Sequence, residues 1–183
     1  REIIEPTIDE LIKRNIEYKG VLYFGLMITK SGPKVIEYNC RFGDPECQTI
    51  MPLMDTNFVN ILYKCASGNL NGNEKVLSSS KVSGCVIAAS KGYPENYDVG
   101  FPISFNFEEQ DDTQIFHSGT SLNKKGEIIS DGGRVLSVVC QGEDFDSAFK
   151  MVYKVLKRIN FDGIYYRRDI GHQVRKNFSY EDL

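Results

Sequence analysis

The feature that most constrains this chain is a polar segment, residues 69–83, that separates two differently patterned halves. It contains Asn71-Gly72-Asn73 and the run Ser78-Ser79-Ser80. Clusters of Asn, Gly and Ser between periodic segments are typical of loops and linkers. We therefore predict two folded units, residues 1–70 and 71–175, followed by a tail or linker at residues 176–183.

The composition is that of a globular protein and excludes some classes of partner. The 183 residues are 41% hydrophobic and 26% charged, and 22 Lys and Arg against 25 Asp and Glu give a net charge of −3. This balance argues against attraction of the whole surface to nucleic acid or to an anionic membrane. We expect no nucleic-acid partner and no membrane partner, so an anionic ligand would need a local basic site.

Three further features concern the cellular setting. The five cysteines are an odd number without a Cys-x-x-Cys pair, which predicts reduced thiols and a cytoplasmic protein. The longest apolar stretch, Val21 to Thr29, is interrupted by Gly25 and falls far short of the roughly 20 residues of a membrane helix. The sequence starts at Arg1 with no leader sequence, so we expect it to be a piece of something longer.

The first half predicts a helix followed by a β-hairpin. Thr7 and Glu10 have the spacing of a capping box, and apolar residues follow at helical spacing up to a stop at Gly20. Residues 21–29 and 34–39 are rich in β-branched and aromatic side chains and flank a turn sequence. Two extended runs joined in this way predict a hairpin.

Asp44 followed by Pro45 predicts the start of another helix, with Asp44 as its cap and Pro45 in its first turn. A further helix is expected at residues 56–67. After the polar segment the pattern predicts an α+β unit. Its expected elements are strands at 84–90, 103–107, 115–118 and 134–141, a hairpin around 124–126 and a helix at 145–159.

Glu37 and Asn39 are the first candidates for chemistry. In a strand, alternate side chains share one face, so these two oxygen-bearing groups project side by side. A carboxylate beside an amide carbonyl suits Mg²⁺, which takes few protein ligands and completes its shell with water and phosphate oxygens. The alternative is that both residues form the hydrated face of an edge strand.

A longer motif contains this pair. The run Glu37-Tyr38-Asn39-Cys40-Arg41-Phe42-Gly43-Asp44-Pro45-Glu46 resembles the signature of the phosphoribosylamine glycine ligases, also called glycinamide ribonucleotide synthetases, which are ATP-grasp enzymes of purine synthesis. Similar segments follow in the order of that family. They are Tyr18 to Tyr23, Ser90 to Pro94, His117 to Thr120, Asp131 to Leu136 and Tyr166 to Gly171.

The resemblance implies a fold and a reaction. It implies an α+β fold: the C-terminal portion of an ATP-grasp domain followed by a small mixed α/β C-terminal domain. It implies ATP-dependent ligation of glycine to 5-phosphoribosylamine through glycyl phosphate, with ATP and Mg²⁺ (or Mn²⁺) as cofactors. The upstream N-terminal and ATP-grasp lobes would be partners from the same polypeptide, and without them we expect the fragment to be inactive. The alternative is a passive substrate- or nucleotide-binding module.

The resemblance also implies roles for individual residues of the first half. Glu37 and Asn39 match the family's magnesium ligands. Ile36 would face the adenine side of the cleft by analogy with other ATP-grasp folds, and its alternative is a core isoleucine. Arg41 would lie at the reacting end of the cleft as a catalytic residue, because its planar fork suits carboxylate or phosphate. The alternative for Arg41 is an ion pair with Asp44 or Glu46.

The remaining candidates would bind substrate. Asp44 could cap its helix or accept the glycine ammonium group, and both can be true because one carboxylate has two oxygens. Glu46 lies in the predicted first turn, where its charge also suits the helix dipole. Gly132-Gly133-Arg134 could bind phosphate through backbone amides and a guanidinium group, or be a plain turn before a strand. Lys91 could place a charge near the ribose phosphate. The tail from Asn177 to Leu183 resembles the start of the aminoimidazole ribonucleotide synthetase region in multifunctional purine-synthesis proteins.

Overall fold

The computed structural model describes residues 1–72, 74–107, 112–176 and 178–179. Its contacts divide the chain into two units, Arg1–Cys47 with Met54–Leu77, and Gln48–Leu53 with Ser78–Leu183. The predicted tail lies mostly outside the described residues, and so does most of the segment that resembles a following enzyme region.

The division between the units falls after Leu77, whereas the sequence placed it after residue 70. Backbone hydrogen bonds give the physical reason. Asp55 N donates to Leu77 O over 3.0 Å, and Leu77 N donates to Thr56 Oγ1 over 2.6 Å, which holds Leu77 in the first unit. Ser79 N donates to Leu53 O over 2.7 Å, which joins Leu53 to the second unit.

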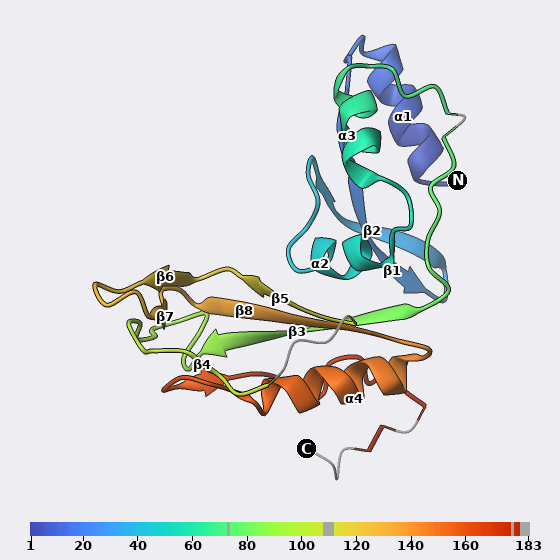
Figure 1. The fold of residues 1–183 in the computed structure, drawn as a ribbon. Coiled ribbons are helices and arrows are strands. Elements are labelled where there is room, and N and C mark those ends of the chain that lie inside the picture. The colour runs from blue at the N-terminus through green and yellow to red at the C-terminus, as the bar shows by residue number, and fades with distance from the viewer. Residues whose placement is uncertain (73, 108–111, 177, 180–183) are drawn as a thin grey trace. The chain divides into compact units, whose positions relative to one another are not determined.

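The first unit contains the predicted hairpin and two of the predicted helices (Figure 1). The hairpin strands are antiparallel, as the sequence predicted. The bounds are α1 Ile4–Lys13, β1 Tyr23–Thr29, β2 Gly32–Asn39 and α3 Phe58–Ala66.

The expected capping box of the first helix is not formed. Thr7 lies inside α1, and its Oγ1 donates to Ile3 O over 2.7 Å. A hydroxyl that bonds the carbonyl four residues earlier is compatible with a helix interior. The helix therefore begins at Ile4, without a side-chain cap, and ends at Lys13 instead of continuing to Gly20.

The helix predicted to start at Pro45 begins later. Asp44 and Pro45 lie in a turn, and the peptide bond between them is cis. The short helix α2 spans Cys47–Ile50, followed by the 3₁₀ turn η1, Met51–Leu53. The next helix, α3, has a side-chain cap, because Asn57 Oδ1 accepts from Asn60 N over 3.0 Å.

The second unit is built on a four-stranded antiparallel sheet with one helix against it (Figure 1). The strand order is β10-β3-β8-β5, and helix α4 packs on β3 and β8. Two small ribbons, β4 with β9 and β6 with β7, complete the unit. The bounds are β3 Val82–Ser90, β4 Ser104–Phe105, β5 Thr113–His117, β6 Thr120–Leu122, β7 Ile128–Ser130, β8 Arg134–Gly142, α4 Phe145–Leu156, β9 Ile159–Asn160 and β10 Ile164–Tyr165.

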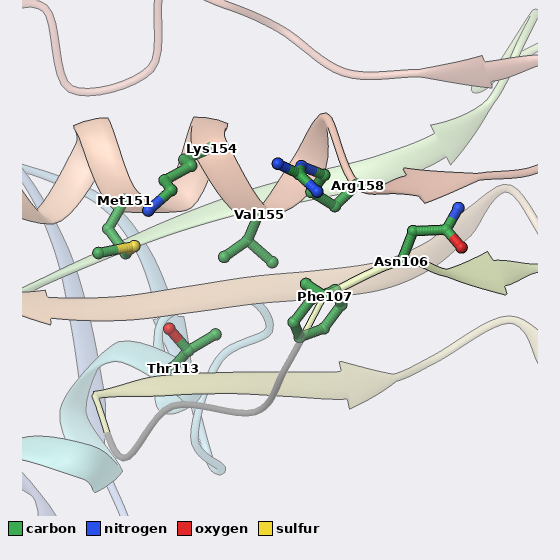
Figure 2. Close-up of a pocket in the computed structure, with 7 residues that line it drawn as sticks. All are labelled: Asn106, Phe107, Thr113, Met151, Lys154, Val155 and Arg158. Carbon is green, nitrogen blue, oxygen red and sulfur yellow. The ribbon is translucent and has the colours of Figure 1, made fainter.

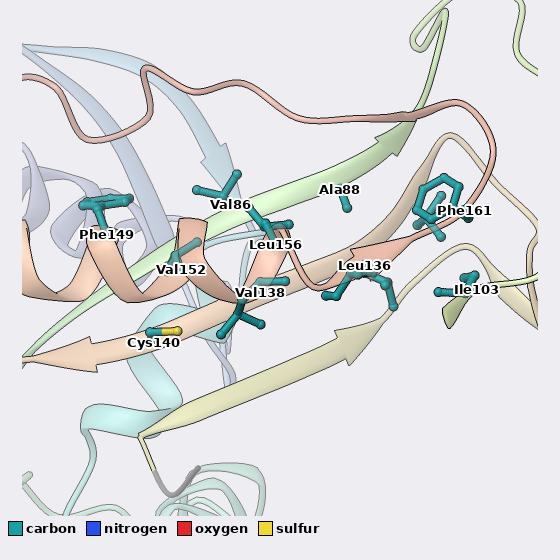
Figure 3. Close-up of a cluster of buried hydrophobic side chains, with 13 residues drawn as sticks. Val86, Ala88, Ile103, Leu136, Val138, Cys140, Phe149, Val152, Leu156 and Phe161 are labelled. Carbon is teal, nitrogen blue, oxygen red and sulfur yellow. The ribbon is translucent and has the colours of Figure 1, made fainter. Parts of the chain in front are cut away.

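A hydrophobic core lies between α4 and the sheet of the second unit (Figure 3). Helix α4 starts with a capping box in which Ser147 N donates to Asp144 Oδ1 over 2.8 Å. Its inward stripe meets alternate residues of the long strands. The core residues are Val86, Ala88, Ile103, Val135, Leu136, Val138, Cys140, Phe149, Val152, Val155, Leu156, Ile159 and Phe161. The α+β class predicted from the sequence is confirmed.

In the parts of the chain that the structure describes, no helix combines the length and the apolar character needed to cross a lipid bilayer.

Candidate functional site

One face of the β1–β2 hairpin carries the predicted metal pair. In the antiparallel register Tyr23 pairs with Asn39, and Gly25 pairs with Glu37. Directly opposite residues of an antiparallel pair place their side chains on the same face. Glu37 and Asn39 therefore share a face with Tyr23 and Gly25, two β1 residues to which the sequence analysis gave no role.

Glu37 and Asn39 are in contact, as their spacing predicted. Asn39 Nδ2 donates to Glu37 Oε1 over 3.0 Å. This bond turns the amide nitrogen toward Glu37 and leaves the amide oxygen of Asn39 and the second carboxylate oxygen of Glu37 for another ligand. Both are hard oxygen donors of the kind that Mg²⁺ or Mn²⁺ takes.

The pair is too small to enclose a metal by itself. Among the described residues there is no group of three or more His, Cys, Asp or Glu side chains that could hold an ion. Mg²⁺ commonly binds one or two protein carboxylates and completes its octahedral shell with waters and nucleotide phosphates. The donor set of Glu37 and Asn39 fits an ion bound in that way.

Because Gly25 has no side chain, it leaves space for the side chain of Glu37. A Cβ atom placed on Gly25 would lie 2.9 Å from Glu37 Cγ, closer than real Cβ contacts come. Gly25 is buried although its strand is otherwise partly or fully exposed. The side chain of Glu37 therefore lies over Gly25, and a larger residue there would have to displace it.

Ile36 occupies an irregular position next to the metal pair. Leu26 pairs with Val35 and Gly25 with Glu37, so Ile36 has no partner of its own in the hairpin register. Its side chain is 63% exposed. The described residues of this chain therefore do not bury Ile36, and its contact with adenine and the alternative of a core position both stay predictions.

The loop after β2 presents two of the predicted residues to solvent. Arg41 is exposed, and its Nη1 donates to Phe42 O over 3.1 Å. No ion pair joins Arg41 to Asp44 or Glu46 among the described residues. Asp44 is exposed and precedes α2, which begins only at Cys47. The ion-pair alternative for Arg41 therefore finds no support.

Glu46 is half-buried and is held by its own loop. Gly43 N donates to Glu46 Oε1 over 2.8 Å. The side chain of Glu46, through hydrogen bonding and its charge, raises the pKa of Tyr23, and burial and the charge of Glu37 add to this. Tyr23 is thus a site residue that sequence reasoning missed. The available signal was its position two residues before Gly25 on the same face of a predicted strand.

The second unit brings together the other predicted residues. Arg134 begins β8 opposite Ala89 of β3, and Lys91 follows β3 two residues later. Ser90 N donates to Gly133 O over 2.8 Å, and Ser90 Oγ donates to Gly132 O over 2.9 Å. Lys91 is exposed and Arg134 is half-buried. The predicted phosphate residues thus form one cluster at one end of β3 and β8.

Both glycines of this cluster also have packing reasons to be glycine. A Cβ on Gly132 would lie 2.9 Å from Gly119 Cα, and a Cβ on Gly133 would overlap the ring of Tyr93. The backbone at Gly119 and the ring of Tyr93 therefore occupy the space that a side chain would need. Phosphate binding by these glycines stays a prediction, and their presence does not depend on it.

A separate pocket of about 530 Å³ lies beside α4 (Figure 2). The cationic Lys154 and Arg158 and the apolar Phe107 and Val155 are among the residues that line it. None of the residues predicted from the sequence lines it. The full lining is Asn106, Phe107, Thr113, Met151, Lys154, Val155 and Arg158.

Comparison with known proteins assigns the first unit to a class. The family model described as "Phosphoribosylglycinamide synthetase, ATP-grasp (A) domain" matches residues 1–47, which contain the hairpin with Glu37 and Asn39. The model described as "Phosphoribosylglycinamide synthetase, C domain" matches residues 83–173. The chain thus combines part of an ATP-grasp domain with a C domain, as the resemblance implied.

Individual relatives agree with this assignment. The phosphoribosylamine–glycine ligase of Caldanaerobacter subterraneus is 47% identical over 170 residues, which cover 93% of this chain and 40% of the relative. A trifunctional purine biosynthetic protein of Gallus gallus is 40% identical over 94% of this chain and 17% of its own length. The crystal structure of the Thermotoga maritima phosphoribosylamine–glycine ligase superposes with a TM-score of 0.80 at 33% identity, over 92% of this chain and 41% of that one.

The chain belongs to the phosphoribosylglycinamide synthetase family. It spans about 40% of the length of the single-function relatives that it matches.

Proposed function

We propose that this chain is the C-terminal part of a phosphoribosylamine glycine ligase. The complete enzyme would use ATP to join glycine to 5-phosphoribosylamine and would give glycinamide ribonucleotide, ADP and phosphate through glycyl phosphate. The matched ATP-grasp and C domains and the names of the relatives support this function. The single observation that carries it is the contact between Glu37 and Asn39, whose side chains lie side by side on one face of the hairpin.

The roles proposed for the first unit follow from its donors and acceptors. Glu37 and Asn39 would hold Mg²⁺ or Mn²⁺, and such an ion would neutralise charge on the phosphates of ATP. Arg41 uses one N–H on the carbonyl of Phe42, and its other N–H groups can bind a phosphoryl or carboxylate oxygen. Asp44 would accept the glycine ammonium group. The exposed side chain of Ile36 would contact adenine.

The second unit would bind the phosphoribosyl substrate. Lys91 and Arg134 place two cations at the same end of neighbouring strands, which suits a phosphate monoester. The N–H groups of Gly132 and Gly133 donate no hydrogen bond among the described residues, so both can bind phosphate oxygens. We propose contacts from these four residues to the ribose phosphate.

The first unit would need partner segments from the same polypeptide. Apolar side chains remain exposed on its helices and on its strands, including Ile12 of α1 at 67% and Ile28 of β1 at 76%. The relatives are longer than this chain, and we propose that their N-terminal and ATP-grasp lobes cover this surface. All five cysteines are free thiols, which supports a cytosolic setting.

The test removes one metal ligand from the full-length enzyme that contains this chain. Glu37→Ala should lower kcat by about 100-fold or more, because preorganised electrostatic stabilisation at a phosphoryl centre contributes on that scale. Lys34→Ala, on the same exposed strand, is the matched control and should leave turnover unchanged. Near-normal turnover of Glu37→Ala would contradict the metal assignment and would favour a passive binding module. Initial rates at saturating ATP, glycine and phosphoribosylamine measure this difference.

A further inference from the structure

Ser90 is a buried polar residue at the end of β3, where the proposed phosphate residues form their cluster. It is only 3% exposed. Ser90 N donates to Gly133 O over 2.8 Å, and Ser90 Oγ donates to Gly132 O over 2.9 Å. One residue therefore binds the carbonyl groups of two successive peptides in the glycine turn.

The bond from the Ser90 hydroxyl also determines the direction of a donor in that turn. The peptide group between Gly132 and Gly133 is trans, so its C=O and its N–H point in opposite directions. The C=O belongs to Gly132 and accepts the Ser90 hydroxyl, and the N–H of the same peptide belongs to Gly133. The Gly133 N–H therefore points away from Ser90.

This N–H is a buried donor without an acceptor in the described parts of the chain. Gly133 is buried, and its N–H donates no hydrogen bond there. Buried backbone N–H groups are nearly always paired, because an unpaired one costs about as much free energy as a lost hydrogen bond. Lys91 directly follows Ser90, and Arg134 directly follows Gly133, so two cationic residues adjoin the donor. An anionic oxygen from a ligand suits this position.

We propose that Ser90 is a positioning residue for the ribose phosphate, because it holds the Gly132–Gly133 peptide so that the Gly133 N–H is directed at a phosphate oxygen. Ser90 itself does not touch the substrate, since its hydroxyl is used on Gly132 O. The proposal rests on the proposed ligase function. It deepens that function by naming the backbone donor that meets the phosphate and the side chain that orients it.

The experiment compares serine variants of the full-length enzyme by steady-state kinetics. Ser90→Ala removes the hydroxyl and keeps the backbone N–H. It should raise the KM for phosphoribosylamine about 10-fold, the scale of a hydrogen bond to a charged group. The kcat and the KM values for ATP and glycine should not change, because lost ground-state binding raises KM alone. Ser90→Thr keeps a hydroxyl and should restore the KM.

Ser137→Ala is the matched control in the same sheet. Ser137 is 0% exposed, and its Oγ has no hydrogen-bond partner within the described part of the chain. Its removal therefore tests the loss of a buried hydroxyl that holds no glycine carbonyl. Ser137→Ala should have the kinetic constants of the wild type.

Three kinetic results would overturn the role of Ser90. The first is an unchanged KM for phosphoribosylamine in Ser90→Ala while Arg134→Ala raises it. The second is a Ser90→Thr enzyme as impaired as Ser90→Ala. The third is a lower kcat with all three KM values unchanged, which would show a loss of folded enzyme and a purely structural role. Failure of the ligase function itself is recognised separately, by normal turnover of Glu37→Ala.

A measurement on the unmutated full-length enzyme covers the case in which Ser90→Ala does not fold. After labelling with [1-¹³C,¹⁵N]glycine, an HNCO spectrum detects only glycines that follow another glycine, and Gly132–Gly133 is the only such pair in this chain. Saturating glycinamide ribonucleotide, the proposed product, carries the same ribose phosphate and should shift the Gly133 amide proton downfield. If no Gly-Gly signal moves, Gly133 does not bind the phosphate and the proposal is wrong.

Discussion

The two units of the chain differ in how they are stabilised. In the first unit, Gly25 is the only buried residue among those that the structure describes. In the second unit, α4 covers β3 and β8 and encloses a continuous hydrophobic core. The unit with the proposed metal ligands thus buries almost nothing by itself, whereas the unit proposed to bind the ribose phosphate has its own core. The comparison teaches that a functional motif and a stable fold need not reside in the same part of a chain.

The sharpest test of this difference removes a large apolar side chain from each unit. Leu136 is 0% exposed and Ile28 is 76% exposed. Leu136→Ala should lower the free energy of unfolding by about 2–5 kcal/mol, the usual cost of a cavity in a packed core. Ile28→Ala should change it by less than about 0.5 kcal/mol. The chain contains no Trp, so urea unfolding followed by circular dichroism is the suitable measurement. Similar losses for both variants would remove the contrast between the units.

A second test concerns a close approach of two backbone segments in the second unit. A Cβ on Gly119 would lie 2.7 Å from Gly132 Cα and 2.8 Å from Arg134 O. Because both atoms belong to the backbone, Gly119→Ala should force a shift and cost about 1–3 kcal/mol of stability, as overpacking does. Ser118→Ala is the control, since its exposed side chain can be shortened without touching this contact. An unchanged midpoint in urea for Gly119→Ala would contradict the packing explanation for these glycines.

The smallest expected effects are at the helix caps, one in each unit. Asn57→Ala removes the cap of α3 and should cost about 1 kcal/mol at any pH, because the amide does not titrate. Asp144→Ala removes the cap of α4, and here the cost should depend on pH. The hydrogen bonds from Ser147 hold the pKa of the Asp144 carboxyl below its ordinary value of 3.8.

The sign of the pH dependence follows from that lowered pKa. A carboxylate with a lowered folded-state pKa stabilises the protein above its unfolded pKa, and this contribution is lost as the pH falls through the folded value. The stability difference between wild type and Asp144→Ala should therefore be full near neutral pH and shrink below pH 3.8. Thermal unfolding at several pH values measures it. A difference that persists at low pH would show that Asp144 does not act through its charge.

Local sequence signals predicted the regular elements well and their ends poorly. The hairpin follows from β-branched and aromatic residues on both sides of a turn sequence, and α3 and α4 follow from apolar residues at helical spacing. The start of α1 could not be read from Thr7, since a threonine hydroxyl can equally bond a carbonyl within a helix, as it does here with Ile3. Strands β9 and β10 have two residues each, too few for any periodic pattern.

The candidate site was predicted only in part, because local sequence signals place residues within one strand and not between strands. The period of two in a strand placed Glu37 beside Asn39, and the contact between them is present. The alternation within β2 alone could not predict which residues of the neighbouring strand share the face of Glu37 and Asn39. Tyr23 and Gly25 enter the site through the pairing of β1 with β2, a contact between residues that are far apart in sequence.

The sequence by itself determined the family and the placement of the side chains of Glu37 and Asn39 next to each other, because each depends on local order along the chain. Only the tertiary structure decided which residues of β1 lie opposite these two side chains. The hairpin register shifts between Gly25 and Leu26, and Ile36 is left without a partner. Without that bulge Gly25 would face Ile36 and Tyr23 would face Tyr38. Because a shift of one residue exchanges the two faces of a strand, the register of the hairpin decides which residues of β1 share a face with Glu37 and Asn39.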